Sequence, residues 1–304
     1  LVLLFPKNFT FYRKLFDVII IFGVSYLILD VLFIKKLLTR GDDLVSQRLS
    51  EFVTEISLPV GFILLTYFYH SAKRNLLSIG IIIITLLITI IRARRGLIFI
   101  TSNIIIFSSI LYFSYSSKKI LFLYVTILLI VLGSLYASNI YNINNNKVFS
   151  FLAQRGDEDT RTGVELYFYD DMKIKDWIVG KGAGGTYFCP DIEVDQVSDY
   201  RSGIETGYLQ LILKGGLINL GLLLLIAVPA SIKGIFFSKN LLSKAAGIWI
   251  LLFMVNLYPQ NAVSFNLSYI LVWISIGICF SAKIRKMTDE DIRDKLLFSQ
   301  EKLF

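Results

Sequence analysis

Residues 208–232 read YLQLILKGGLINLGLLLLIAVPASI, and this run decides the fold. It is long enough to cross a bilayer, which takes roughly 17 to 25 mostly apolar residues in a helix. It therefore predicts a transmembrane helix. The run begins in a polar segment that contains arginine and glutamate, and charge at the mouth of a membrane span is expensive and usually functional.

Seven further apolar windows lie on either side of this run, near 15–34, 53–70, 76–91, 97–114, 119–138, 245–258 and 264–281. The chain is 55% hydrophobic with a mean hydropathy of +0.65, whereas soluble domains are about 45 to 50% apolar. The sequence thus predicts an all-α polytopic membrane protein with about eight transmembrane helices. Because the chain opens with leucine rather than methionine, we interpret it as a fragment or a processed form whose earlier spans are missing, so eight is a minimum.

The 304-residue chain carries a formal net charge of +8. In a multispanning protein, excess lysine and arginine usually marks the cytoplasmic loops, so nucleic acid is not an expected partner. Cys189 lies in a polar loop and Cys279 in a predicted span, and no residues have metal-ligand spacing. The sequence therefore predicts no metal site and no cofactor.

The basic residues of the short loops fall consistently on one side of the predicted bundle, which we interpret as cytoplasmic. The predicted organisation is about five transmembrane helices in 1–138, a large extracytoplasmic loop in 139–207, about three helices in 208–282 and a cytoplasmic amphipathic tail in 283–304. Asp17 and Asp30 lie near the two ends of the first span, and Asp30 with Lys35 is interpreted as a local pair.

The tight turn IRARRG, residues 91–96, contradicts this charge rule, because it places Arg92, Arg94 and Arg95 on the extracytoplasmic side. The arginines could extend from the helix ends to anionic headgroups. They could also form an anion site for phosphate or pyrophosphate, because guanidinium groups bind such groups in a bidentate geometry. We favour the anion site.

The 139–207 loop is too long for a passive connection. Arg161 directly precedes an apolar-periodic segment for which Thr160 is a candidate cap, so its guanidinium is expected at a helix N-terminus that attracts anions. One or two helices are expected to follow along the membrane surface, with Tyr167, Tyr169 and Trp177 at interfacial depth.

The glycine-rich stretch GKGAGG, residues 180–185, lacks the strand and helix of a dinucleotide fingerprint. It predicts a tight turn at which the backbone approaches a ligand or another helix, with Gly182 at its centre. Lys181 is a candidate phosphate contact, although an exposed loop lysine is commoner.

The segment YRSGIETGYLQLILKGG places Arg201, Glu205 and Tyr208 on one helical face if the helix begins early enough. Thr206, Gln210 and Lys214 form a second row, and both rows are expected to face the bundle interior or a water-filled cavity. Lys214 could contact a ligand or extend to headgroups. Glu205 is the preferred general base, and the alternative is a salt bridge with Arg201.

The order of these motifs resembles the O-antigen polymerase and O-antigen ligase superfamily over roughly Ile91 to Leu225. The resemblance implies a membrane glycosyltransferase with a GT-C-like bundle, which acts on polyprenyl-pyrophosphate-linked oligosaccharide without nucleotide sugar or obligatory metal. Arg95 and Arg161 match the arginines of that family. Ligases typically carry a histidine where this chain has Glu205, and this departure favours a polymerase.

The sequence therefore predicts a polymerase of O-antigen, capsule or exopolysaccharide repeat units in the inner membrane of a bacterium, with its site on the extracytoplasmic side. The expected partners are lipid-linked oligosaccharide, the bilayer, a chain-length regulator and a flippase. A ligase, a lipid-linked oligosaccharide transporter and a non-catalytic assembly subunit are the alternatives. The predicted catalytic residues are Arg95, Arg161 and Glu205; the predicted substrate-binding residues are Arg92, Arg94, Lys181, Gly182, Arg201, Tyr208 and Lys214; and a sugar groove is expected at Tyr187, Phe188 and Tyr200.

Overall fold

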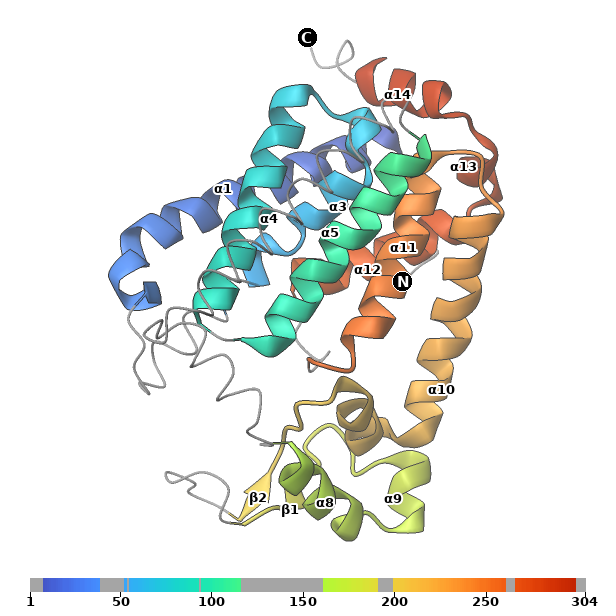
Figure 1. Cartoon of the computed structure of the whole chain (residues 1–304). Helices are drawn as coiled ribbons and strands as arrows, with labels where there is room; N and C mark the ends of the chain where they lie inside the picture. The colour runs from blue at the N-terminus through green and yellow to red at the C-terminus, as the bar shows by residue number, and fades with distance from the viewer. Residues whose placement is uncertain are drawn as a thin grey trace.

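The structure is a computed structural model that describes residues 8–38, 52–53, 55–92, 94–115, 161–190, 199–260 and 266–298. These residues form a bundle of apolar helices with a small polar unit at one end (Figure 1). The bundle contains α1 (Phe9–Leu38), α3 (Val60–Leu65), η2 (Tyr67–Tyr69), α4 (Ala72–Ile91), α5 (Arg95–Tyr115), α10 (Gly207–Phe236), α11 (Leu241–Asn256) and α12 (Leu267–Phe280). The polar unit, termed the loop unit, contains α8 (Thr162–Asp171), α9 (Ile174–Val179), β1 (Tyr187–Phe188) and β2 (Tyr200–Arg201).

Four helices of the described residues are long and apolar enough to cross a membrane: Phe9–Ile34 of α1, all of α4, all of α5 and all of α10. Shorter apolar helices cover Glu55–Leu65, α11 and α12. The chain is therefore a helical membrane protein, as predicted, and the short antiparallel pair β1–β2 is the only sheet in the described part. The predicted span 119–138 lies outside the described residues.

The predicted span 53–70 is not one continuous helix. The short helix α3 follows Pro59 and ends at Thr66, whose hydroxyl donates to the Phe62 carbonyl at 2.7 Å. The same hydroxyl lies 2.9 Å from Nε2 of His70. Most of α3 is buried in the centre of the bundle, so its apolar character serves packing between helices rather than contact with lipid.

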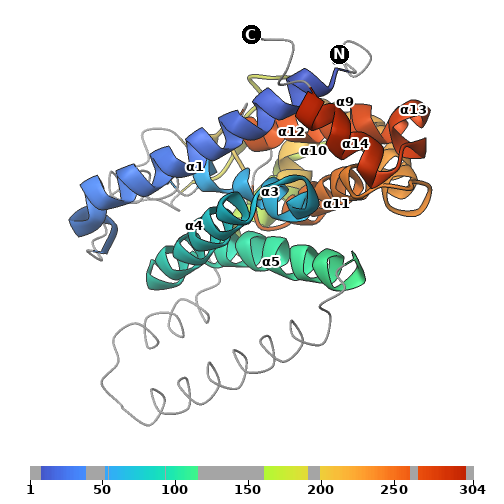
Figure 2. The same cartoon turned by 90° about the horizontal axis from the view of Figure 1, so that it is seen from above.

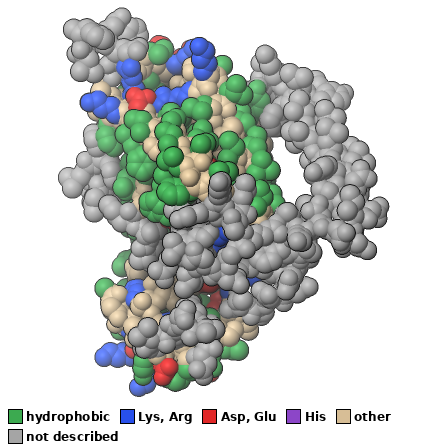
Figure 3. All heavy atoms as spheres, turned by 90° about the vertical axis from the view of Figure 1, so that its left-hand side faces the viewer, with side chains coloured by type: hydrophobic (Ala, Val, Ile, Leu, Met, Phe, Trp, Pro, Cys, Tyr) green, Lys and Arg blue, Asp and Glu red, His purple; other side chains and the backbone are tan. Residues whose placement is uncertain are grey.

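Close helix packing at the centre of the bundle depends on two glycines. A Cβ built on Gly23 of α1 would lie 2.7 Å from Val60, and one built on Gly61 of α3 would lie 2.6 Å from Ile104 of α5. Small residues at such crossings let helices approach closely in membranes. Away from the core, exposed apolar side chains of α1 and α4 form part of a hydrophobic band on the surface (Figure 3).

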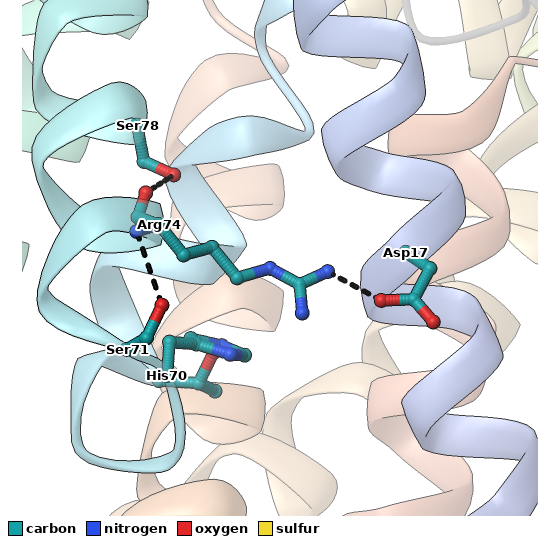
Figure 4. Close-up of polar contacts among 6 residues, drawn as sticks. Asp17, His70, Ser71, Arg74 and Ser78 are labelled. Atoms are coloured by element: carbon teal, nitrogen blue, oxygen red, sulfur yellow. Dashed lines mark hydrogen bonds and ion pairs between the residues drawn. The ribbon is translucent and has the colours of Figure 1, made fainter.

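The end of the bundle opposite the loop unit gathers most of the basic residues that the sequence placed inside. Arg74 at the start of α4 makes a 2.9 Å ion pair with Asp17 of α1 (Figure 4). The tail forms α13 (Ala282–Lys286) and the amphipathic helix α14 (Asp289–Phe298), which packs against α1 (Figure 2). Asp289 fastens α14 by accepting hydrogen bonds from the hydroxyl of Tyr69 and from the backbone of Leu241.

The loop unit has a hydrophobic core of its own. Phe168 of α8 and Tyr187 of β1 are fully buried, and their rings meet edge to face at 5.6 Å. The core also contains Cys189 and, from the first turns of α10, Leu209 and Leu213. The unit thus extends past residue 207, where the sequence had placed its end. It is a folded body with a core, and the expected placement of its helices along the membrane surface stays a prediction.

Helix α10 is interrupted at Gly216, which has the left-handed backbone φ of 68°. The segment before this break belongs to the loop unit, and the segment after it continues along the bundle (Figure 1). A Cβ built on Gly216 would lie 2.0 Å from the Ile178 carbonyl oxygen of α9. Gly180 lies at the same contact between α9 and α10. Its φ is 74°, and a Cβ built on it would lie 2.5 Å from the Gly215 nitrogen. The predicted span 208–232 therefore coincides with an apolar helix that is long enough to cross a membrane, and the break at Gly216 is a feature that the sequence did not predict.

Candidate functional site

Arg161 and Glu205 meet where the loop unit joins the bundle. Arg161 immediately precedes α8, and its Nε donates to Oε2 of Glu205 at 2.9 Å. Its terminal nitrogen donates to the Pro259 carbonyl, just after α11, at 3.0 Å. The Arg161 side chain is 33% exposed and that of Glu205 is 62% exposed, so both groups remain accessible to a ligand.

The arginine-rich turn between α4 and α5 reaches the same carbonyl. A Cβ built on Gly96 would lie 2.9 Å from the Pro259 oxygen. The turn therefore packs against the same Pro259 carbonyl that accepts the hydrogen bond from Arg161. Arg95 is the neighbouring residue and is exposed. We call this meeting point of Gly96, Arg161, Glu205 and Pro259 the Pro259 junction. Two arginine segments that are remote in sequence thus come together there, as the sequence predicted.

The three arginines of the turn differ in burial. Arg92 ends α4 and is only 8% exposed, whereas Arg94 is half-buried and Arg95 begins α5 on the surface. Burial among helices does not fit the interpretation that Arg92 extends into headgroups. The burial of Arg92 fits a guanidinium group that packs between helices at this end of the bundle.

Glu165 is a neighbour that the sequence analysis missed. It lies one turn after Arg161 on α8, and its Oε1 accepts a hydrogen bond from the hydroxyl of Thr206. Two adjacent contacts therefore join α8 to the start of α10, with Arg161 meeting Glu205 and Glu165 meeting Thr206. The spacing of four residues between Arg161 and Glu165 was the available signal.

The predicted helical face of Arg201, Glu205 and Tyr208 does not exist. Arg201 lies in β2, Glu205 lies in the bend ahead of α10, and the helix begins only at Gly207. Tyr208 points toward α11, where its hydroxyl donates to the Met254 carbonyl. Tyr208 is therefore a packing contact between α10 and α11.

The polar row of Thr206, Gln210 and Lys214 faces the loop unit instead of a water-filled cavity. Gln210 accepts from the Ile204 backbone at 2.9 Å, and Lys214 donates to the Gly185 carbonyl at 2.8 Å. Because the row precedes the break at Gly216, its polar groups are satisfied by the folded loop. Lys214 thus has a main-chain partner in the loop unit, and its role in binding substrate stays a prediction.

The glycine-rich turn contacts α10, which was one of its two predicted partners. The Lys181 backbone donates to the Leu213 carbonyl at 2.7 Å, and its ammonium pairs with Asp171 of α8. Gly182 has a φ of 87° and open space around it. The turn therefore fixes α10 against α9, and Lys181 already has a carboxylate partner.

Two of the three aromatic residues expected in a sugar groove are exposed. Phe188 and Tyr200 pair across the β1–β2 strands with ring centroids 5.7 Å apart. Tyr187 is fully buried, and its hydroxyl donates to the Gly203 carbonyl at 3.2 Å. Burial raises the pKa of Tyr187 above the usual tyrosine value, while Arg201 opposes that rise. Tyr187 is therefore a neutral core residue and not a groove residue.

An apolar cavity of about 80 Å³ opens beside the Pro259 junction. Gln260 lines one end of it, and Ile100 and Ile104 of α5 and Trp249 of α11 form apolar walls. Asn256 also lines it, with a buried side-chain oxygen that has no hydrogen-bond partner among the described residues. Such a cavity suits a hydrocarbon segment with a polar group near its mouth.

Within the described residues, no group of three or more histidine, cysteine, aspartate or glutamate side chains could hold a metal ion. Comparisons with known proteins find no matching family model, no matching curated protein and no matching solved structure. The resemblance to O-antigen polymerases and ligases therefore stays a prediction that depends on the order of the motifs.

Proposed function

We propose that the protein is a polymerase of polyprenyl-pyrophosphate-linked oligosaccharide repeat units. The observation that carries the proposal is the convergence of Arg161, Glu205 and the Arg94–Gly96 turn at the Pro259 junction. In this proposal about eight helices cross the inner membrane of a bacterium, and the loop unit faces the extracytoplasmic side. The apolar cavity beside the junction suits the hydrocarbon of the lipid carrier.

In the proposed reaction, a sugar hydroxyl of one lipid-linked unit attacks the anomeric carbon of the chain held on the other carrier. The new glycosidic bond forms as the bond from that carbon to the pyrophosphate breaks, and the pyrophosphate leaves with the bonding electrons. Arg161 and Arg95, assisted by Arg92, Arg94 and Arg201, stabilise the charge that develops on the leaving group. The proton of the attacking hydroxyl passes to Glu205.

The ion pair at the junction supports a proposed order for these events. Glu205 accepts from Arg161 in this structure, so its carboxylate has a partner before substrate binds. A pyrophosphate carries more charge than a carboxylate and offers oxygens that match the guanidinium fork. When pyrophosphate occupies Arg161, Glu205 is released to accept a proton. Binding the donor thus prepares the base.

The test is the product that the full-length protein makes in liposomes supplied with lipid-linked repeat units. We expect a ladder of polymers that remain attached to polyprenyl pyrophosphate, and protein-free liposomes give none. Glycan transferred to a different lipid acceptor would identify a ligase. Units that cross the membrane without a new glycosidic bond would identify a transporter. Either of these two outcomes rejects the polymerase proposal.

A further inference from the structure

A buried carboxyl lies inside the bundle, apart from the Pro259 junction. Asp30 of α1 is 5% exposed, and neither of its oxygens has a hydrogen-bond partner among the described residues. One turn earlier, Tyr26 is fully buried with a hydroxyl that is likewise unpartnered in the described part of the chain. Buried polar groups in proteins are nearly always satisfied, so two adjacent exceptions require an explanation.

The helices around Asp30 supply oxygen atoms. The Tyr26 hydroxyl lies near Asp30 and near Thr85 of α4, without a hydrogen bond of normal geometry to either. Thr85 is fully buried and donates to the hydroxyl of Ser57 at 2.8 Å. Carboxyl and hydroxyl oxygens from α1, α4 and the segment before α3 therefore meet at one place in the bundle.

This place lies between apolar helices that are long enough to cross a membrane. Thr85 is 13 residues after Ala72 at the start of α4, a distance of about 20 Å at 1.5 Å per residue. In a bilayer that α4 crosses from Ala72, Thr85 lies about two thirds of the way through a hydrocarbon core of about 30 Å, and Asp30 lies near the end of its own span. An ionised carboxyl buried between such helices is costly unless a cation or a proton neutralises it.

No described side chain supplies the neutralising charge. Tyr26 is the only titratable group in the described residues found to interact with the Asp30 carboxyl. Helix α3 carries no titratable residue, and α14 packs against α1 at the opposite end, where Lys295 lies over Phe9. From α4, Thr85 faces the site, and Arg92 lies two turns farther along. The side chain of Lys35, the predicted partner of Asp30, lies outside the described residues.

The nature of the surrounding groups favours a proton over a metal cation. The described neighbour of the Asp30 carboxyl is a single hydroxyl, that of Tyr26. A proton needs no vacant volume, whereas a cation needs a cage of several oxygens. Protonation also turns the Asp30 carboxyl into a donor, for which the hydroxyl oxygen of Tyr26 is an acceptor.

A buried row of polar side chains lies on α4. Thr85, Thr89 and Arg92 occupy positions i, i+4 and i+7, so they share one face of the helix. Their exposed fractions are 0%, 1% and 8%, so this face is buried along its length. The row begins beside Asp30 and ends at the arginine-rich turn.

We propose that Asp30, with Tyr26 beside it, forms a buried proton-binding site in the helix bundle. This site is separate from the proposed glycosyl transfer, and its readout does not depend on polymer formation. It explains the unpartnered oxygens of Asp30 and Tyr26 as a protonated carboxyl beside a hydroxyl.

Labelling with dicyclohexylcarbodiimide tests this proposal in the full-length protein in detergent or liposomes. This apolar reagent reacts with protonated carboxyl groups: the carboxyl oxygen bonds to the central carbon, the proton moves to a nitrogen, and the adduct rearranges to a stable N-acylurea. We expect peptide mass spectrometry to find the label on Asp30 at about pH 7, where an exposed aspartate with a pKa near 3.9 is ionised.

The variants distinguish a protonated carboxyl from an ion-paired one. Asp30→Asn loses the label. Asp17→Asn is the matched control on the same helix, because Asp17 is half exposed and paired with Arg74, and it leaves Asp30 labelling unchanged. Lys35→Gln also leaves labelling unchanged. Label that appears on Asp30 only in Lys35→Gln would show an ion pair and overturn the proposal.

Two further outcomes would overturn it. The absence of label on Asp30 in the wild-type protein would show that the carboxyl is ionised or inaccessible. Protection by sodium chloride, but not by choline chloride, would show a cation site. Because the label is mapped directly on the wild-type chain, the result holds even if Asp30→Asn folds poorly.

Discussion

Replacing Arg161 with lysine or alanine is expected to lower polymer formation by about 10²- to 10³-fold, the usual effect of removing one group that stabilises charge in a transition state. Lysine keeps the charge but loses the planar fork that binds pyrophosphate in a bidentate geometry, so it should rescue little activity. The measurement is the initial rate of polymer formation from lipid-linked repeat units.

The matched control for Arg161 lies at the other end of the bundle. Arg74 also makes a 2.9 Å ion pair with a partly exposed carboxylate, that of Asp17. Exposed ion pairs contribute only about 0 to 1 kcal/mol to stability, so neither Arg161→Ala nor Arg74→Ala should unfold the protein. We expect Arg74→Ala to retain the wild-type rate. Equal loss of rate in both variants would contradict a specific role for Arg161.

Glu205→Gln separates the two roles of Glu205. Glutamine keeps the size of the side chain but cannot take a proton, so the polymerisation rate should fall while binding of a pyrophosphate probe is retained. Loss of the competing carboxylate beside Arg161 should even strengthen that binding. A variant that polymerises normally would remove Glu205 from the reaction.

Gly216→Ala is expected to have the largest effect on stability, a loss of at least about 3 kcal/mol. An alanine at this left-handed position is strained, and its Cβ would lie 2.0 Å from the carbonyl oxygen of Ile178. The clash involves backbone on both sides, so no side-chain rotation can relieve it. Thermal unfolding in detergent, followed by circular dichroism, measures the effect.

Two other glycines separate the causes of that loss. Gly221 lies on the same helix, and a Cβ built on it would have no neighbour within 4 Å, so Gly221→Ala should be neutral or slightly stabilising. Gly182 has a φ of 87° but open surroundings, so Gly182→Ala reports backbone strain alone. If Gly216→Ala lowered the stability no more than Gly182→Ala, the close contact between α9 and α10 would not be what makes Gly216 necessary.

The fold class was predictable because membrane helices need long apolar runs, and α1, α4 and α5 coincide with such runs. The break in α10 was not, because apolar residues that fill the core of a small folded unit have the same hydropathy as those that face lipid. Leu209 and Leu213 belong to the loop unit, although they continue the apolar pattern of the span. The polar Gln210 and Lys214 beside Gly215 and Gly216 were the available signal.

The candidate site was predictable in part for a related reason. The arginine-rich turn was predicted because its positive charge lies on the side where short loops usually avoid it. Arg161 was predicted because it directly precedes a helix. Their common contact is a main-chain atom, the carbonyl oxygen of Pro259, and no side-chain pattern indicates a main-chain acceptor. Glu165 was missed because an acidic residue in the first turn of a helix is ordinary.

The burial of both cysteines makes the orientation of the chain measurable. Cys189 and Cys279 are the two cysteines of the sequence, and neither is exposed to solvent in the fold. A membrane-impermeant maleimide should therefore leave the folded native protein unmodified, so that a single introduced thiol can be read without a cysteine-free background. Lys175→Cys on α9 and Glu290→Cys on α14 occupy exposed positions at opposite ends. In intact cells, the first should react and the second should not.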